Sequence, residues 1–154
     1  MRTFLKYTTC IVLPLIVGGL SGYFTASNIA TWYVTLNKPF FNPPNYLFGP
    51  VWTVLYLMMG ISLGMIINVK HSNKNKSLII FSIQLMLNFF WSVIFFSLQS
   101  PGWAAIEIIA LWLSIIYMII SFYKINKWAG LLQIPYLLWV TFASVLNISI
   151  YVLN

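Results

Sequence analysis

Three apolar stretches of the 154-residue chain carry polar and aromatic side chains along a single helical face. In one of them, Gln84, Asn88 and Trp91 follow at i, i+4 and i+7, with Phe95 at i+11, which predicts a shared side of a helix. Amides inside an apolar helix are unfavourable without partners and usually face the interior of a bundle. The other two stretches carry Trp52, Tyr56 and Gly60, and Gln133, Tyr136, Trp139, Ala143 and Asn147.

These residue types favour a binding cavity for a large, planar, mostly apolar ligand. Aromatic faces can enclose such a ligand while a few amide and phenol groups orient it. The alternative is that the amides only join helices, where a pair contributes about 1–2 kcal/mol or less. Asn88 or Asn147 alone would suit that alternative, and the combination with Trp52, Trp91 and Trp139 favours the cavity.

Residues for acid–base or metal chemistry are scarce. Glu107 is the one acidic residue of the chain, so no second carboxylate accompanies it. Near the start of a helix its charge is favoured by the helix dipole and can reach the membrane interface, and a pair with Lys38 is the alternative. Cys10, His71 and Glu107 lie in different segments, so no metal site is expected.

Composition identifies the class of protein. Hydrophobic residues make up 61% of the chain and charged residues 6%, whereas soluble domains carry about a quarter charged residues. The net charge of +7 is spread thinly, with no basic stripe interleaved with aromatics, which argues against nucleic-acid binding. An integral membrane protein surrounded by lipid is therefore predicted.

Charges and turn residues divide the chain into apolar runs long enough for helices of about 20 residues, the length that spans a bilayer. The N-terminal run shows no convincing signal-peptide cleavage site and is interpreted as a first membrane helix. We predict an all-α, five-helix bundle forming a single membrane domain over 1–154. The helices are expected at about 5–26, 45–69, 78–98, 103–123 and 130–152, with an aromatic first loop at 27–44.

The distribution of Lys and Arg between the loops predicts the orientation. With five spans, one side carries Arg2, Lys6, Lys70, Lys74, Lys76, Lys124 and Lys127, and the other carries only Lys38. We therefore expect a multi-pass protein of the cell membrane with its N-terminus in the cytoplasm and its C-terminus outside. The first loop then lies outside, as a lid over the bundle or as an aromatic belt at the headgroups.

Two small-residue pairs predict close approaches between helices. Gly18 and Gly22, and Gly60 and Gly64, both have the Gly-x-x-x-Gly spacing that lets helix backbones come together. Such pairs can serve contacts within the bundle or between two copies of the chain.

Three segments, 32–62, 84–96 and 135–147, resemble the translocator protein family, also called tryptophan-rich sensory proteins or TspO/MBR. They contain the loop motif W-Y-x-x-L-x-K-P, the motif P-x-W-x-x-L-Y-x-x-M-G of the second helix and the motif N-x-x-W-S of the third. Their spacing and the total length agree with the family, and the similarity is close to bacillus-type bacterial members.

The resemblance implies a five-helix, often dimeric protein, so a homodimer is expected. It also implies a cavity beneath the first loop for porphyrins such as protoporphyrin IX and for isoquinoline-carboxamide ligands, with no separate cofactor. Carried over by motif, the cavity residues are Trp32, Tyr33, Pro43, Trp52, Tyr56, Asn88, Trp91, Trp139, Ala143, Leu146 and Asn147.

Two other activities follow from the resemblance as alternatives. Light- and oxygen-dependent degradation of protoporphyrin would make Trp52 and Trp139 the reactive residues, and tetrapyrrole transport is the second alternative. No inverted repeat and no chain of ionisable groups supports transport. Cholesterol binding in animal members needs a C-terminal Tyr followed by Lys or Arg, and here Tyr151 is followed only by Val-Leu-Asn, which argues against it.

Overall fold

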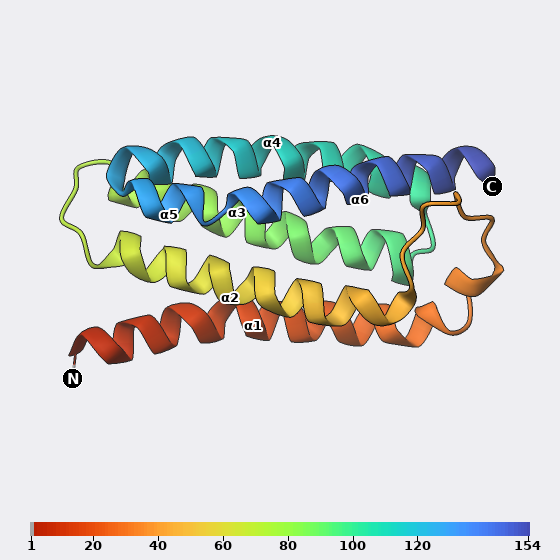
Figure 1. Cartoon of the computed structure of the whole chain (residues 1–154), viewed down its shortest axis with the longest axis horizontal. Helices are drawn as coiled ribbons and strands as arrows, with labels where there is room; N and C mark the ends of the chain where they lie inside the picture. Colours follow the sequence, from red (N-terminus) through yellow and green to blue (C-terminus); the bar gives the residue numbers. More distant parts are fainter. Residues whose placement is uncertain (1) are drawn as a thin grey trace.

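A computed structural model describes residues 2–154 as a bundle of long helices aligned along one axis (Figure 1). The spanning segments run over 3–29, 45–67, 74–97, 101–125 and 127–153, and no strand occurs among the residues described. The predicted all-helical membrane protein with five spans is thus confirmed. The elements are α1 (Arg2–Ile29), η1 (Tyr33–Thr35), η2 (Asn45–Leu47), α2 (Phe48–Ile67), α3 (Lys74–Ser92), η3 (Val93–Ser97), α4 (Pro101–Ile125), α5 (Lys127–Leu131) and α6 (Ile134–Leu153).

The last span differs from the single helix expected at 130–152, because it is divided into α5 and α6. The Asn126 side chain starts α5 by accepting hydrogen bonds from the backbone N–H groups of Trp128 and Ala129, at 3.0 and 3.2 Å. Pro135 lies in the first turn of α6, where backbone N–H groups have no partner within the helix, so the missing N–H of proline costs no hydrogen bond. The third span also differs, since α3 continues into the π-helical turn η3 before the chain reverses.

Helices α1 and α2 pack closely because glycines of α2 lie against α1. A Cβ atom added at Gly60 would meet the backbone of Cys10 and Ile11, and one added at Gly64 would meet the Tyr7 ring. The Gly60–Gly64 pair therefore serves a contact within the bundle. On the other side of the bundle α4 packs against both α3 and α6.

The first loop packs over the end of the bundle at which the C-terminus lies (Figure 1). Tyr33 is 2% exposed and contacts Phe95 and Phe96, with ring centroids 6.2 and 5.8 Å away. The backbone N–H of Asn37 donates to Oδ1 of Asn154 at 2.9 Å, and Nδ2 of Asn154 donates back to the Asn37 carbonyl at 3.0 Å. These bonds fasten the loop to the end of α6.

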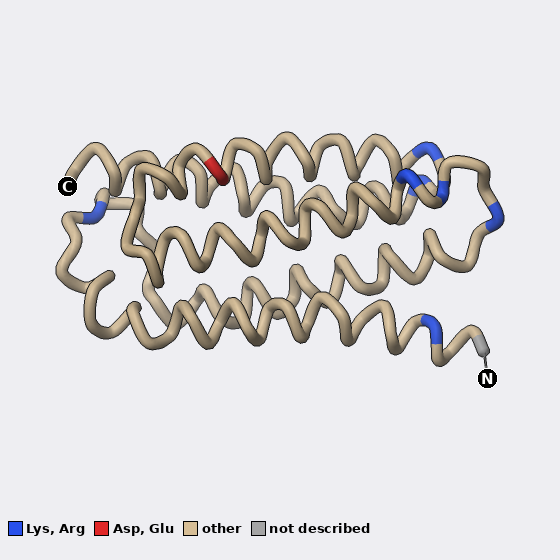
Figure 2. Tube along the Cα trace, turned by 180° about the vertical axis from the view of Figure 1, so that it is seen from behind, with Lys and Arg blue, Asp and Glu red and all other residues tan. Residues whose placement is uncertain are grey.

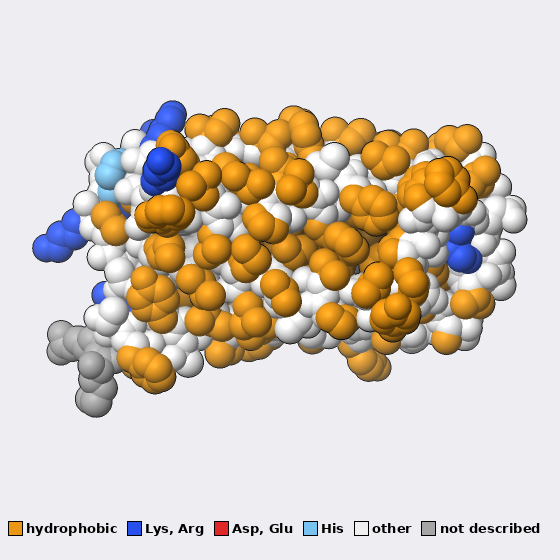
Figure 3. All heavy atoms as spheres, viewed as in Figure 1, with side chains coloured by type: hydrophobic (Ala, Val, Ile, Leu, Met, Phe, Trp, Pro, Cys, Tyr) orange, Lys and Arg blue, Asp and Glu red, His pale blue; other side chains and the backbone are white. Residues whose placement is uncertain are grey.

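Basic residues lie at the two ends of the bundle, and the one acidic residue lies part-way along a helix (Figure 2). Most of the Lys and Arg residues drawn in Figure 2 lie at the end that holds the N-terminus. Lys38 belongs to the first loop, which is fastened to the C-terminus at the other end. On the face shown in Figure 3, hydrophobic side chains make up most of the surface between the ends, as a protein surrounded by lipid requires. Which end faces the cytoplasm remains a prediction from the charge count.

Candidate ligand-binding site

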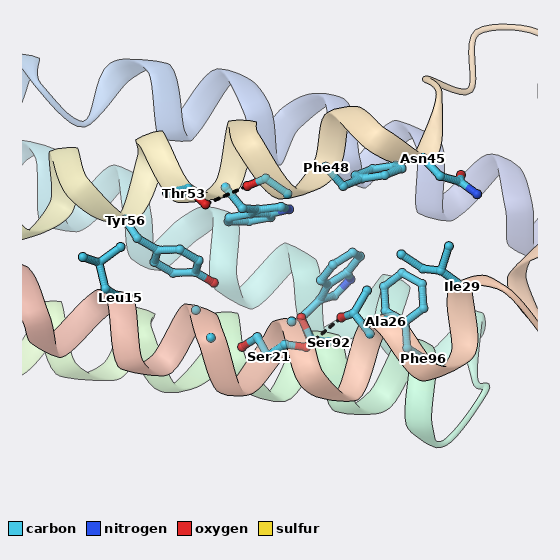
Figure 4. Close-up of a pocket in the computed structure, with 17 residues that line it drawn as sticks. Leu15, Ser21, Ala26, Ile29, Asn45, Phe48, Thr53, Tyr56, Ser92 and Phe96 are labelled. Atoms are coloured by element: carbon cyan, nitrogen blue, oxygen red, sulfur yellow. Dashed lines mark hydrogen bonds between the residues drawn. The ribbon is translucent and has the colours of Figure 1, made fainter.

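A cavity of about 380 Å³ lies between α1, α2 and the end of α3, next to the first loop (Figure 4). We call it the main lobe. Its walls are mostly apolar or small side chains, and no charged residue lines it. The lining residues are Leu15, Gly18, Gly19, Ser21, Gly22, Thr25, Ala26, Ile29, Asn45, Phe48, Gly49, Trp52, Thr53, Tyr56, Trp91, Ser92 and Phe96.

Glycines of α1 create the space of the main lobe. A Cβ atom added at Gly19 or Gly22 would meet nothing within 4 Å, whereas one added at Gly18 would meet the Tyr56 ring. Gly18 thus lets Tyr56 lie flat against α1, and the other two leave the cavity unfilled. Because Gly22 and Gly49 are exposed as well as lining the lobe, the cavity opens between α1 and α2 toward the lipid-facing surface.

A smaller space of about 30 Å³, the side lobe, lies against α6. Four aromatic residues line both lobes and separate them, and we call these the shared wall: Phe48, Trp52, Trp91 and Phe96. The remaining lining residues of the side lobe are Tyr33, Phe95, Trp139, Phe142, Ala143, Leu146, Asn147 and Ile150. Movement of the shared wall would join the two lobes.

The aromatic rings around both lobes form stacked and edge-to-face pairs. Trp52 stacks on Tyr56 with centroids 5.6 Å apart and an interplanar angle of 28°. Trp91 stacks on Phe95 at 5.4 Å and 26°, and Phe48 meets Trp139 edge-on at 6.3 Å. Such pairs are worth about 0.5–1.5 kcal/mol beyond burial, so the rings hold one another in place.

A buried hydrogen-bond network lies beneath the main lobe. The Tyr56 hydroxyl donates to Oδ1 of Asn88. Nδ2 of Asn88 donates to the Tyr136 hydroxyl at 3.1 Å, and that hydroxyl donates to Oε1 of Gln84 at 2.9 Å. The network joins α2, α3 and α6 and fixes the ring of Tyr56, which itself lines the cavity.

The structure brings most of the predicted site residues to the two lobes. Trp52, Tyr56 and Trp91 line the main lobe, and Tyr33, Trp52, Trp91, Trp139, Ala143, Leu146 and Asn147 line the side lobe. Asn88 lies behind Tyr56 in the buried network, at 1% exposure.

Besides Asn88, two predicted site residues, Trp32 and Pro43, line neither lobe. Trp32 lines a separate groove on the outside of the bundle, between α4 and α6. The carbonyl of Pro43 accepts a hydrogen bond from Nδ2 of Asn42 within the first loop, at 3.1 Å. These residues shape the lid rather than the cavity wall.

The sequence-based list of cavity residues contains no residue of α1, although α1 supplies a large part of the wall of the main lobe. Gly19, Ser21 and Gly22 line the main lobe, whereas the Gly-x-x-x-Gly spacing of Gly18 and Gly22 predicts only a helix contact. A signal was available, since Ser21 interrupts the apolar run between two glycines. A polar residue within a stripe of small residues is typical of a cavity wall as well as of a helix contact.

Ionisable groups near the lobes do not form a catalytic pair. Both carboxyl oxygens of Glu107 are buried and make no hydrogen bond, so this side chain neither reaches the interface nor pairs with Lys38. Nζ of Lys38 instead donates to the carbonyl oxygens of Tyr33 and Leu36, at 2.8 and 2.9 Å. Burial raises the pKa of the Tyr33 phenol to about 12, so it stays a neutral donor to Asn42.

Side chains that could hold a metal ion do not lie together in the part of the chain that the structure describes. Within residues 2–154 there is no cluster of three or more His, Cys, Asp or Glu side chains. The walls of the two lobes offer a ligand aromatic faces and a few hydrogen-bonding groups.

Comparison with known proteins gives consistent similarities over almost the whole chain. Residues 10–153 match the TspO/MBR family. The chain is 43% identical to "Tryptophan-rich protein TspO" of Chlorobaculum tepidum, covering 99% of this chain and 98% of that protein. It is 45% identical to the protein of the same name from Archaeoglobus fulgidus, over 97% of each. It is 30% identical to the human "Translocator protein", over 78% of this chain and 73% of the human one.

Proposed function

The chain belongs to the TspO/MBR family and crosses the membrane several times, and we propose that it is a receptor for tetrapyrroles such as protoporphyrin IX. The ligand occupies the main lobe and, when the shared wall moves, extends into the side lobe. Isoquinoline carboxamides, which also carry flat aromatic rings, occupy the same space.

The observation that carries this proposal is an apolar cavity whose wall includes two indole rings. Trp52 and Trp91 line both lobes, so a flat ligand in either lobe contacts them. Stacking on each ring favours a planar π system, and the cavity volume falls within the usual range of about 300–1,000 Å³ for small-molecule sites. A hydrophilic solute would find few partners on these walls.

The opening between α1 and α2 supports a ligand that arrives through the membrane. Gly22, Ala26, Gly49 and Thr53 are exposed and also line the main lobe. Three of the four are Gly or Ala, so the gap is not blocked by long side chains. An apolar porphyrin concentrated in the bilayer therefore has a direct path into the cavity from lipid.

The test is a titration of the purified protein with protoporphyrin IX, followed by quenching of tryptophan fluorescence. We expect saturable quenching, because Trp52 and Trp91 would contact the ligand, and displacement of the porphyrin by an isoquinoline carboxamide. Linear, non-saturable quenching without displacement would show mere partition into detergent and would contradict the proposal.

A second candidate function, light-dependent porphyrin degradation, is favoured by one observation. Trp139 lines the side lobe together with Trp52 and Trp91, and its indole N–H is buried without a hydrogen-bond partner. An excited porphyrin between these indoles could use molecular oxygen to oxidise itself or a neighbouring ring. Replacing Trp139 by Phe should then slow the loss of porphyrin absorbance under light and oxygen. Equal loss in the variant and the wild type would contradict the degrading activity and leave ligand binding as the function.

A further inference from the structure

A second apolar hollow, the α2–α6 groove, runs along the outside of the bundle between these two helices and has a volume of about 560 Å³. It shares no lining residue with the main lobe, which opens between α1 and α2. Val54 of α2 and Leu138 of α6 line the groove and are 54% and 65% exposed, so it faces the lipid. Its walls are proline rings, aliphatic side chains and the indole of Trp139, without a charged group.

The ring of Trp139 lies between this groove and the interior of the protein. Of the residues that line the groove, only Trp139 also lines the side lobe. Displacement of this one ring would therefore join the groove to the side lobe. A lipid tail or a second copy of the chain would need no connection to the interior, so this continuity favours a ligand on its way to the lobes as the occupant.

The ring of Trp139 can turn without breaking a hydrogen bond. Its indole N–H has no partner, and the ring packs on Phe48 and Phe142 with centroids 6.3 and 5.5 Å away. The indole N–H groups of Trp91 and Trp112, in contrast, each donate to a side chain of α6, at 3.0 and 2.8 Å. Because Trp91 belongs to the shared wall, displacing its ring from the main-lobe side breaks a hydrogen bond, whereas displacing Trp139 from the groove does not.

The shape and polarity of the groove limit what it accepts from the bilayer. The rings of Pro50, Pro135 and Trp139 give it flat faces, against which a planar π system packs well. An ionised group inside it would be a buried charge without a partner, which is strongly unfavourable. Pro50 lies in the first turn of α2, close to the first loop, so charged groups at one edge of a ligand can stay outside the groove at that end.

We propose that the α2–α6 groove is a docking site at which a planar, amphiphilic ligand leaves the bilayer, and that Trp139 is the gate through which it enters the side lobe. The inference rests on the proposed function of the two lobes. It gives the protein an entrance from lipid to the side lobe that is separate from the opening between α1 and α2.

The experiment measures how fast protoporphyrin IX binds to and leaves the full chain in lipid nanodiscs, followed by porphyrin fluorescence. Dissociation is started by an excess of an isoquinoline carboxamide. Val54→Trp and Leu138→Trp each place an indole in the groove at positions that line neither lobe. Bulk in the route raises the barrier in both directions and leaves the bound ligand untouched. We expect both rate constants to fall by about 10-fold, or about 1.4 kcal/mol of barrier, with an unchanged dissociation constant.

The matched control is Val145→Trp on α6, at a position 52% exposed that lines neither the groove nor a lobe. It should keep the wild-type rate constants. Trp139→Leu separates a gate from a binding contact. Loss of a contact alone would raise only the dissociation rate constant, whereas removal of a gate raises the association rate constant as well.

The outcomes distinguish this inference from the proposed function. If the wild type binds the porphyrin and folded Val54→Trp and Leu138→Trp keep its rate constants, the groove holds only lipid tails or a second copy of the chain. The inference is then wrong and the proposed function stands. A dissociation rate constant that alone rises in Trp139→Leu would likewise contradict the gate. If the wild type does not bind the porphyrin saturably, the proposed function fails and the inference falls with it.

Discussion

The indole Nε1 of Trp91 donates a hydrogen bond to Oδ1 of Asn147 at 3.0 Å, joining the end of α3 to α6. The amide of Asn147 in turn donates to the carbonyl of Pro101 at 2.8 Å, at the start of α4. One buried amide thus links three helices and sets the position of a ring that separates the two lobes. The shared wall is therefore held by α6 and not only by its own helix.

Replacing Asn147 by Leu should remove the hydrogen bond that positions the Trp91 ring in the shared wall. The change keeps the volume but leaves the Trp91 N–H and the Pro101 carbonyl without partners, which costs about 1–3 kcal/mol. We expect a lower thermal unfolding temperature in detergent and a shift of the tryptophan emission. Asn75→Leu, at an exposed position near the start of α3, serves as control. Unchanged unfolding and emission in Asn147→Leu would argue that the bond does not fix Trp91.

The buried network beneath the main lobe should be tested at Tyr136. Phe at this position removes the hydroxyl that accepts from Asn88 and donates to Gln84, leaving both amides short of a partner. We expect a loss of about 1–3 kcal/mol in unfolding free energy. Tyr151→Phe on the same helix, at a position 57% exposed, should change stability little. Equal effects of the two substitutions would contradict the structural role of the network.

Two glycines of α1, four residues apart, should respond to alanine in opposite ways. Gly18→Ala drives a Cβ atom into the Tyr56 ring, and overpacking of this kind costs about 1–3 kcal/mol. Gly22→Ala meets nothing within 4 Å, so the variant should gain about 0.5–1 kcal/mol from helix propensity. Thermal unfolding of the two variants compares them directly. The same sign for both would mean that α1 does not approach α2 as described.

The orientation in the membrane is tested by cysteine labelling in a Cys10→Ala background. A cysteine at Asn75 should react with an impermeant maleimide only from the cytoplasmic side, since the lysine-rich end is expected there. One at Phe40, which is 100% exposed in the first loop, should react only from outside. Labelling of both from one face would contradict a five-span topology.

The sequence was sufficient to predict the number of spans and several of the aromatic residues around the two lobes. Periodicity placed Trp52 and Tyr56 on one face of α2, and both line the main lobe. It could not predict that Trp91 pairs with Asn147, because a contact across 56 positions depends on how two helices are rotated against each other. It also could not show that Gly22 faces empty space while Gly18 faces a ring, since both fit the same small-residue pattern.

Binding of tetrapyrroles inside the two lobes is tested by substitutions that fill each lobe. Gly22→Leu projects into the main lobe, and Ala143→Phe projects into the side lobe, whose volume is about 30 Å³. Ala110→Leu, on the exposed face of α4, is the control for added bulk.

The decisive measurement is the dissociation constant of protoporphyrin IX for these three variants and the wild type, from tryptophan quenching of protein shown to be folded. Overpacking a site costs about 1–3 kcal/mol, and this cost weakens binding roughly 5- to 150-fold. We predict losses in this range for Gly22→Leu and Ala143→Phe, and wild-type affinity for Ala110→Leu. Wild-type affinity in folded Gly22→Leu and Ala143→Phe would place the porphyrin elsewhere and contradict the account.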